Sequence, residues 1–287
     1  MNTLVSVVIP SYNRASVLEA SARSVLEQTW SEFELIIVDD GSTDDTRAVV
    51  EAIGDPRLRY VYQENAGACA ARNHGVALAN GACIAFHDSD DLWHRDKLEK
   101  QLRCMEERGA DVVICKQYHI HPDGTRHLAP KRIGEGFLPP KADLFGVGTQ
   151  AILARREVLE AEAFDVDMPR LQDFEWLYRV RRRFRVYCLD EGLVDYMVSA
   201  DSITRSHEKR FQAMALFLEK HPEVRREQPF LCAHAVKDLL ESWSAVRKDG
   251  GAESGKYLRL ALRYYPGALR FAASALRLRA ERAENRR

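Results

Sequence analysis

The chain has 287 residues, of which 46% are hydrophobic and 30% charged, with a formal net charge of −1 at pH 7. That balance is typical of a soluble globular protein and excludes a chain that is disordered throughout. No stretch reaches the roughly 18 consecutive apolar residues that a membrane-spanning helix requires. Because the N-terminus runs directly into a strand pattern, we expect neither a secreted nor an integral membrane protein.

Six cysteines are present, and none of them forms a Cys-x-x-Cys pair. The first four, at positions 69, 83, 104 and 115, lie in apolar or helical surroundings, and the others are at 188 and 232. Free cysteines are among the residues most often buried in proteins. We therefore expect reduced thiols in the core, without disulfides.

Strand-like and helical patterns alternate through the first 116 residues. Strands are expected at residues 5–10, 33–39, 58–63, 82–87 and 111–116, and helices at residues 15–28, 45–53, 66–79 and 95–108. This alternation is typical of a doubly wound, mainly parallel α/β sheet. In such sheets ligands bind at the carboxyl ends of the strands, so the side chains that follow each strand are candidates for a site.

The pattern is looser beyond residue 117. Gly and Pro residues punctuate residues 117–147 and predict an irregular excursion. A short strand, two helices and a last strand are then expected at residues 149–153, 155–160, 172–183 and 185–189. From residue 205 the sequence is helical, so we expect a main domain over residues 1–204 and a helical C-terminal extension over residues 205–287.

The last 32 residues, 256–287, are basic, with nine Lys or Arg and two Glu, and they are also rich in Leu and aromatic residues. One interpretation is a surface that meets anionic lipid headgroups or an anionic substrate. The other is a pair of helices that packs on the body of the protein and leaves a solvated basic rim. The sequence favours neither interpretation over the other.

The first two strand ends differ from those of dinucleotide-binding enzymes. The first strand is followed by SYNR at residues 11–14, which lacks the Gly-x-Gly-x-x-Gly turn that lets a backbone approach a pyrophosphate. The second ends in VDDGS at residues 38–42, where Asp39 is placed to accept hydrogen bonds from a ribose hydroxyl or a base N–H. The alternative for this second segment is an acidic turn with a helix-capping Asp.

The fourth strand ends in HDSDD at residues 87–91, with three carboxylates within four residues. In an extended segment Asp88 and Asp90 project to the same side, and Asp91 faces elsewhere. Paired carboxylates suit Mg²⁺ or Mn²⁺ bridging a diphosphate. A helix N-terminus favoured by its dipole would explain Asp90 or Asp91 but not all three acids.

Four blocks in this order resemble family 2 glycosyltransferases. They are VSVVIPSYNR at residues 5–14, IVDDGS at 37–42, NAG with ARN between 65 and 73, and FHDSDD at 86–91. The resemblance implies a GT-A nucleotide-diphospho-sugar transferase fold of the inverting, bacterial cell-surface glycan type. It also implies a nucleotide-sugar-binding half over residues 1–116 and an acceptor-binding half over residues 117–204.

The resemblance assigns the donor site to residues of these blocks. Pro10, Tyr12 and Arg14 would line the nucleotide pocket, Asp39 would contact the base, and Arg72 would support the base or a phosphate. Asp88 and Asp90 would hold Mn²⁺ or Mg²⁺ as the Asp-x-Asp motif. The full expected donor-binding set is Pro10, Tyr12, Arg14, Asp39, Asp40, Arg72, Asp88, Ser89 and Asp90.

A catalytic base is expected at Asp173, because family 2 enzymes carry an acidic pair at the start of a helix that ends in Arg. The matching segment here is LQDFEWLYR at residues 171–179, in which Gln172 stands where Glu is usual. Loss of that charge would change how Asp173 is oriented or how its pKa is set. Glu175 is the rival base, but it lies about 200° round the helix from Asp173.

A second departure concerns the metal. Many relatives offer a His after the last strand, where this chain has Ser199, so a third protein ligand is in doubt and Asp201 or water could substitute. His119, His121 and His127 could form a cluster in the irregular excursion. Histidines in a polar loop are usually solvated, so we assign them no role.

The resemblance implies an enzyme that transfers a sugar from a nucleotide-diphosphate donor, expected to be a UDP-sugar, to a hydroxyl of a saccharide or lipid-linked glycan, with inversion. We expect a cytoplasmic protein and no nucleic acid partner. A lipid-linked acceptor would make residues 256–287 a contact with the membrane surface. A catalytically degenerate nucleotide-sugar-binding module is the alternative, because Gln172 departs from the family pattern. A nucleotidyltransferase would need a glycine-rich basic loop at residues 11–14, and a receiver domain would need an Asp after the third strand, where YVYQ occurs.

Overall fold

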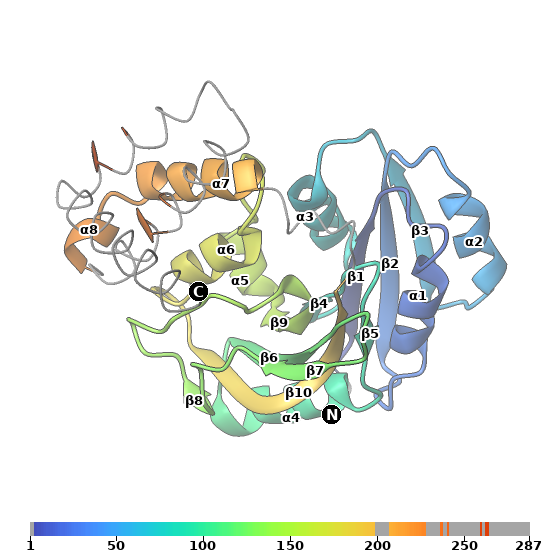
Figure 1. The fold of residues 1–287 in the computed structure, drawn as a ribbon. Helices are drawn as coiled ribbons and strands as arrows, with labels where there is room; N and C mark the ends of the chain where they lie inside the picture. Colours follow the sequence, from blue (N-terminus) through green and yellow to red (C-terminus); the bar gives the residue numbers. More distant parts are fainter. Residues whose placement is uncertain are drawn as a thin grey trace. The chain divides into compact units, whose positions relative to one another are not determined.

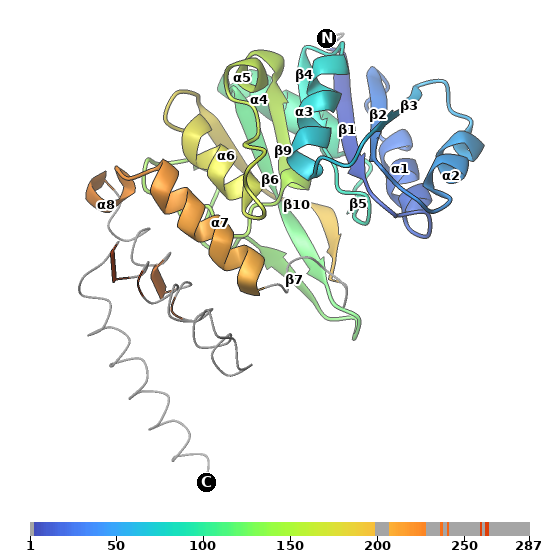
Figure 2. The ribbon, with the colours of Figure 1, turned by 90° about the horizontal axis from the view of Figure 1, so that it is seen from above.

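The structure of the protein is a computed structural model that describes residues 3–198 and 207–227, together with 236–237, 240, 259 and 262–263. The chain divides into two compact units. The first contains Met1–Asp167 and Gln172–Ser202, and the second contains Met168–Leu171 and Ile203–Arg287. Figures 1 and 2 show the elements of both units in chain-order colours.

The first unit is built on a mixed sheet whose main strand order is β3-β2-β1-β4-β9-β6-β10-β5. Its N-terminal half is parallel, with β1 between β2 and β4, and β3 outside β2. The strands of this half are β1 (Val5–Ser11), β2 (Phe33–Asp40), β3 (Leu58–Gln63) and β4 (Cys83–Phe86). Because the strands are parallel, their carboxyl ends lie at one edge of the sheet.

Helices cover both faces of this parallel half, as the sequence predicted. Helices α1 (Leu18–Leu26) and α2 (Thr46–Ile53) lie on one side, and α3 (Ala68–Leu78) lies on the other (Figure 1). The alternation of side chains along β1 explains this, since Val7 and its alternate neighbours belong to the core cluster that includes α1. Val8 points to α3, where an added Cβ on Gly75 would lie 2.3 Å from it.

The C-terminal half of the sheet differs from the expected pattern. β9 lies between β4 and β6 and is antiparallel to both, whereas β10 is parallel to β6. The strands here are β5 (Leu92–Trp93), β6 (Val112–Ile120), β7 (Arg126–Ala129), β8 (Gly136–Phe137), β9 (Ile152–Arg155) and β10 (Val186–Met197). The helices are α4 (Lys97–Arg108), α5 (Arg156–Ala161) and α6 (Gln172–Val180).

Two strand expectations in this half are corrected. Residues 149–151, expected in a strand, form the 3-10 helix η1 (Thr149–Ala151), and the strand begins only at Ile152. The last strand, expected to end at residue 189, continues to Met197 because it follows β6 through two register shifts, one on each side of Gly192. Such irregularities depend on the partner strand and leave little trace in the sequence pattern.

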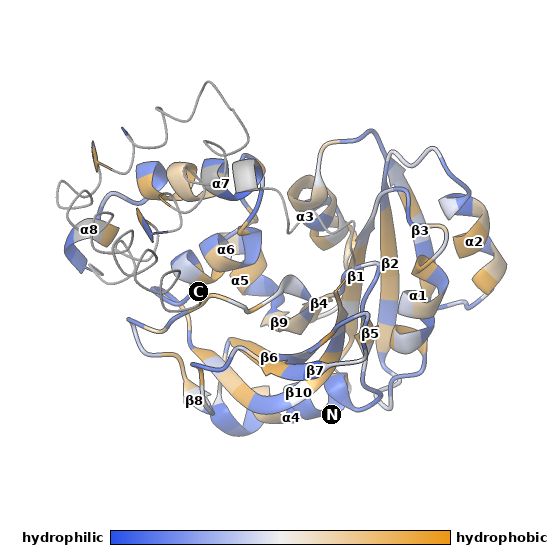
Figure 3. Cartoon of the chain, in the orientation of Figure 1, coloured by the Kyte–Doolittle hydropathy of each residue, from blue (hydrophilic) through white to orange (hydrophobic). Residues whose placement is uncertain are grey.

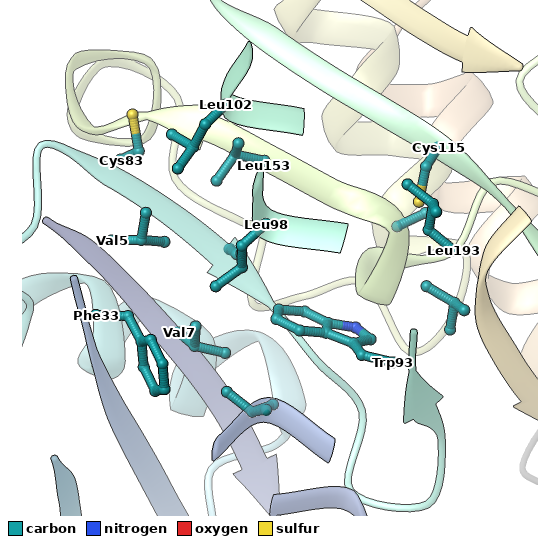
Figure 4. Packing of buried hydrophobic residues seen from close by; sticks show 14 of the residues in the cluster. Val5, Val7, Phe33, Cys83, Trp93, Leu98, Leu102, Cys115, Leu153 and Leu193 are labelled. Atoms are coloured by element: carbon teal, nitrogen blue, oxygen red, sulfur yellow. The ribbon is translucent and has the colours of Figure 1, made fainter. Parts of the chain in front are cut away.

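The core of the first unit lies between the sheet and helices α1 and α4 (Figure 4). Leu98 and Leu102 of α4 are buried there together with Trp93 and with Val5 of β1. Figure 3 shows hydrophobic colour along the central strands and hydrophilic colour on the outer side of α4. The described cysteines are all free and buried, as expected, at positions 69, 83, 104, 115 and 188.

The second unit contains α7 (His207–Lys220) and α8 (Val224–Glu227) among its described residues. Cys232, Ser199, Asp201 and most of the basic segment 256–287 lie outside the described residues. Across the part of the chain that the structure describes, every helix is too short or too polar to cross a bilayer.

Candidate active site

The turn after β1 is braced against the turn after β2. Asn13 has a φ of 52°, in the left-handed region that Asn tolerates better than most residues. Its backbone N–H donates to Ser42 Oγ at 2.8 Å, and its side-chain Oδ1 accepts from Thr43 N at 2.8 Å. This brace holds Tyr12, which is 49% exposed, at the carboxyl edge of the sheet, while Pro10 is buried in β1.

Asp39 is buried at the end of β2, and both of its carboxylate oxygens are held. Ser42 N donates to Oδ1 at 2.8 Å, and the Tyr60 hydroxyl donates to Oδ2 at 2.7 Å. A carboxylate has about four acceptor positions, so these bonds orient Asp39 and leave it able to accept from a ligand. Its expected contact with the nucleotide base stays a prediction.

Asp40, the next residue, anchors the segment that leads into α3. Its Oδ1 accepts from Gln63 Nε2 at 2.7 Å and from Ala66 N at 2.8 Å, and its Oδ2 accepts from Gly67 N at 2.8 Å. Gly41 is required beside it, because its φ is 83° and a Cβ would lie 2.9 Å from Asn65 N. The structure thus gives Asp40 a role in holding the backbone, and its expected contact with the donor stays a prediction.

The three carboxylates after β4 have different surroundings. Asp88 Oδ1 accepts from Arg72 Nη2 at 2.8 Å and from the Thr149 hydroxyl at 3.1 Å. Asp90 is half-buried, and its Oδ2 lies 3.8 Å from Arg14 Nη2. Burial and the neighbouring Asp88 carboxylate raise the pKa of Asp90, and Arg14 opposes this shift. A divalent cation placed here would relieve the repulsion between Asp88 and Asp90.

Asp91 points away from Asp88 and Asp90, as the alternation of side chains along an extended segment predicted. It is fully buried, and its Oδ1 accepts from Met197 N of β10 at 2.9 Å. Burial, with Asp88 and Asp90 nearby, raises the pKa of Asp91 well above its usual range. Ser89, between the two half-buried acids Asp88 and Asp90, is buried. Asp91 therefore ties the acidic loop to the far half of the sheet.

The described residues contain no group of three or more His, Cys, Asp or Glu side chains arranged to hold a metal. Asp88 and Asp90 fit a different kind of site. Mg²⁺ is commonly bound by one or two carboxylates together with substrate phosphates and water, without an all-protein cage. The carboxylates of Asp88 and Asp90 are therefore suited to bind a divalent ion that arrives with a diphosphate.

Asp173 lies in the first turn of α6 and is half-buried. Its Oδ1 accepts from Phe174 N at 2.7 Å. Burial raises the pKa of Asp173 to about 6, against the lowering effects of the Phe174 hydrogen bond and the Arg72 charge. A carboxylate with a pKa near neutrality is suited to accept a proton from a hydroxyl.

Glu175, the rival base, is committed to a structural ion pair. Its side chain is 2% exposed, and its carboxylate accepts from Arg179 Nε at 2.7 Å and Nη2 at 3.0 Å. Arg179 also pairs with Glu162, which precedes α6 in the chain. The helix therefore points Glu175 away from Asp173's surroundings, as the helical period predicted.

Arg72 joins the acidic loop to α6. It is 5% exposed, and its Nη1 donates to Gln172 Oε1 at 2.8 Å while its Nη2 donates to Asp88 and to Thr149 Oγ1 at 3.1 Å. The ring of Phe164 lies 5.8 Å from its guanidinium carbon. The structure thus brings together Arg72, Asp88 and the helix that carries Asp173, residues expected in one site.

Thr149 and Asn13 are site residues that the sequence analysis missed. Thr149 was assigned to a strand, and no local signal marks a hydroxyl that bonds a carboxylate 61 residues away. Asn13 carried a usable signal, because Asn in a turn after a strand is typical of the left-handed conformation that it adopts.

The three histidines left unassigned do come together, on the hairpin of β6 and β7. His119 pairs with His127 across the strands, and His121 Nε2 lies 3.3 Å from His127 Nδ1. Burial and the two neighbouring imidazoles lower the pKa of His119 to about 4. His119 and His127 therefore lie in strands and not in an irregular loop, whereas His121 lies in the turn between the strands and His127 is exposed.

Comparison with known proteins identifies the family. Residues 6–177 match the model of glycosyl transferase family 2. TuaG of Bacillus subtilis (strain 168), a glycosyltransferase assigned to teichuronic acid biosynthesis, is 35% identical over 213 residues, covering 70% of this chain and 81% of TuaG. The chain belongs to glycosyltransferase family 2, which confirms the resemblance seen in the motifs.

Another relative is the UDP-Glc:alpha-D-GlcNAc-diphosphoundecaprenol beta-1,3-glucosyltransferase WfgD of Escherichia coli. It is 35% identical over 164 residues, which cover 56% of this chain and 64% of WfgD. Some relatives are much longer, since the chain spans only 15 to 20% of three uncharacterized glycosyltransferases from Rickettsia species. Similarity to these long proteins is therefore confined to one part of them.

Solved structures confirm the expected GT-A fold. The S. aureus TarS 1-349 complex with UDP-GlcNAc has a TM-score of 0.65 at 19% identity, covering 96% of this chain and 91% of that one. The mannosyltransferase PcManGT from Pyrobaculum calidifontis, in complex with GDP-Man and Mn²⁺, has a TM-score of 0.63 at 19% identity, and the match covers 98% of this chain and 86% of PcManGT. At these identities the likeness concerns the fold.

Proposed function

We propose that this glycosyltransferase transfers a sugar from a UDP-sugar to a hydroxyl of a saccharide or lipid-linked glycan, with inversion at the anomeric carbon. One observation carries the proposal: Asp88, beside Asp90, is hydrogen-bonded to the same guanidinium as Gln172, the residue before Asp173. Arg72 thereby links Asp88, proposed for the diphosphate end, to the start of the helix that carries Asp173, proposed for the acceptor end. Within family 2, this arrangement is suited to a single in-line displacement.

In the proposed reaction Asp173 accepts the proton of the acceptor hydroxyl as its oxygen bonds to the anomeric carbon and the bond to the nucleotide diphosphate breaks. Asp88 and Asp90 would hold Mn²⁺ or Mg²⁺, which when bound stabilises negative charge on the leaving diphosphate. Arg14, 3.8 Å from Asp90, adds a positive charge at the same edge. Tyr12, exposed after β1, offers a ring on which a nucleotide base can stack.

The choice of ligands rests on relatives. TarS has been seen with UDP-GlcNAc, PcManGT with Mn²⁺, and WfgD is named for UDP-Glc and a diphosphoundecaprenol-linked sugar. We extend these ligand classes to this chain as part of the proposal. The acceptor would be a cell-surface glycan or its lipid-linked precursor, with the basic segment 256–287 contacting the cytoplasmic membrane surface and no nucleic acid involved.

The test is a panel of UDP-, GDP- and dTDP-sugars with Mn²⁺, following nucleotide release and the thermal midpoint of unfolding. Comparison of wild type, Asp90→Ala and Asp45→Ala provides a matched control, because Asp45 is an exposed carboxylate at the start of α2. We expect metal-dependent stabilisation and slow release with UDP-sugars for wild type and Asp45→Ala. Asp90→Ala should lose both, since the metal stabilises through its carboxylate.

A degenerate nucleotide-sugar-binding module remains the second candidate, because Gln172 stands where a Glu is usual in the family. The two candidates differ in one result. A binding module would be stabilised by a nucleotide sugar and metal but would release no nucleotide, with or without saccharide acceptors. Nucleotide release that depends on Asp90 would exclude it.

A further inference from the structure

The contacts of Arg72 connect three segments that are far apart in the sequence. The guanidinium, carried by α3, donates to Gln172 at the start of α6, to Asp88 after β4, and to Thr149 in η1. The Thr149 hydroxyl lies 3.1 and 3.3 Å from the two carboxylate oxygens of Asp88. Asp88 therefore has two donors on one side, both fixed by buried residues.

The side chains of this network differ in exposure. The Arg72 and Thr149 residues are 5% and 4% exposed, whereas the Asp88 side chain is 27% exposed. Arg72 is covered by its neighbours, and its Nε is buried without a hydrogen-bond partner. Because Arg72 and Thr149 are covered, they would act on a bound ligand through the more exposed carboxylate of Asp88.

Gln172 completes the network without adding charge. Its amide oxygen accepts from Nη1, so Arg72 keeps its ion pair with Asp88 while its second terminal nitrogen is also satisfied. A Glu at this position would place a second carboxylate on the same guanidinium and next to Asp173. The amide therefore provides the geometry of a bridge without a negative charge beside the expected base.

We propose that Gln172 and Thr149 are positioning residues of the transfer reaction. Gln172 acts through Arg72, and Thr149 acts through Arg72 and through its own hydrogen bond to Asp88, so that the Asp88 carboxylate and the helix of Asp173 are held in one fixed relation. The inference rests on the proposed function, because it assigns the diphosphate end to Asp88 and the proton acceptor to Asp173. Displacements of about 1 Å between reacting groups lower rates by about 100-fold, so such a bridge has a measurable effect.

The first experiment compares wild type, Gln172→Met and Gln172→Glu at pH 8, measuring kcat, the donor KM and the Kd of UDP with Mn²⁺. Met preserves the length of the side chain but accepts no hydrogen bond, so we expect kcat to fall about 10-fold or more while the Kd of UDP changes less than about 3-fold. Glu restores the acceptor, and we expect kcat within about 3-fold of wild type.

The second experiment uses Thr149→Val, which has the same shape without the hydroxyl. Asp88 then keeps the Arg72 hydrogen bond and loses the other. We expect the Mn²⁺ concentration needed for half-maximal rate to rise about 3-fold to 10-fold, because the carboxylate is less well oriented. Thr125→Val in the exposed hairpin is the control and should leave that concentration unchanged.

The outcomes separate the inference from the proposed function. A wild type that neither binds UDP nor releases nucleotide would overturn the proposed function, and the inference with it. An active wild type whose kcat per folded molecule is unchanged in Gln172→Met overturns the inference alone. The same holds if Thr149→Val leaves the Mn²⁺ dependence unchanged, or if Gln172→Glu is as slow as Gln172→Met, since a packing role needs no hydrogen-bond acceptor.

Discussion

Two carboxylates two residues apart on α6 have opposite properties because their surroundings differ. Asp173 lacks an ion-pair partner in the described network, and burial raises its pKa to about 6. Glu175 accepts two hydrogen bonds from Arg179 and is buried in that pair. A carboxylate with a raised pKa can take up a proton near neutral pH, whereas the oxygens of Glu175 are occupied by the guanidinium of Arg179.

Asp173→Asn should lower the rate of sugar transfer by about 100-fold to 10,000-fold, because the amide cannot accept the acceptor's proton. Its Kd for UDP with Mn²⁺ should change less than about 3-fold. In wild type, kcat should fall as pH decreases through about 6, where Asp173 becomes protonated. Steady-state rates from pH 5 to 9 with paired UDP titrations check this, and a rate that is flat across pH 6 would contradict it.

The same substitution should also change how the free energy of unfolding depends on pH, and the pKa shift gives the direction of the change. A carboxyl whose pKa rises from 3.8 in the unfolded chain to about 6 in the folded one destabilises the fold above pH 6. Below about pH 3 both states are protonated and the penalty disappears. Asp173→Asn should therefore raise the free energy of unfolding by about 3 kcal/mol at pH 8, with almost no gain at pH 3, as measured by urea unfolding.

At the scale of elements, α6 is held by charged pairs on one side and presents Asp173 on the other. Arg179, in its last turn, pairs with Glu175 and with Glu162. The start of α3 is held in a comparable way by Asp40, which accepts from the backbone N–H groups of Ala66 and Gly67. Buried carboxylates therefore fix the start of α3, the helix that carries Arg72, and the last turn of α6, the helix that carries Asp173 in its first turn.

Glu175→Gln tests this division of roles. Removing one partner of a buried ion pair costs about 3 kcal/mol, so the midpoint of thermal unfolding should fall by several degrees. The kcat per folded molecule should stay within about 3-fold of wild type, because Glu175 does not face Asp173. Calorimetry and kinetics on the same preparation check both values. A loss of kcat comparable to that of Asp173→Asn would instead make Glu175 the base.

At the scale of the whole molecule, the parallel half and the mixed half belong to one continuous sheet. A buried lysine of α4 lies beneath the place where the two halves meet. Lys97 of α4 is fully buried, donates to Gln101 Oε1 at 2.7 Å, and lies 3.8 Å from the centre of the Trp93 ring. Gln101 in turn donates to the backbone of β6 and η1. Burial lowers the pKa of Lys97 to about 8.

From the lowered pKa of Lys97 we expect the protein to become more stable as the pH rises above 8. The pKa of Lys97 is 10.5 in the unfolded chain and about 8 in the folded one, so burial of the charged lysine lowers the stability of the fold. This loss of stability disappears as the pH rises from 8 to 10.5, because the lysine is then deprotonated in the folded protein. Relative to Lys97→Met, wild type should gain about 2 kcal/mol in unfolding free energy between pH 7 and 9.5. Denaturant unfolding of both proteins checks this, and parallel pH profiles would contradict it.

The sequence by itself determined the alternation of strands and helices through residue 116, the absence of a dinucleotide-binding turn and the family. Each of these is encoded locally, in periods of two and 3.6 residues or in the residues that follow a strand. It also singled out Asp88, Asp90 and Asp173 as a group, although their roles in donor binding and catalysis stay predictions.

Only the tertiary structure decided how those residues are held. That Arg72 bonds Gln172, 100 positions away, depends on where the folded chain places α3 and the start of α6. The antiparallel entry of β9 between β4 and β6, and the extension of β10 to Met197, depend equally on partner strands. Such contacts are set by the close packing of distant segments, and hydrophobic periodicity carries no record of which segments will meet.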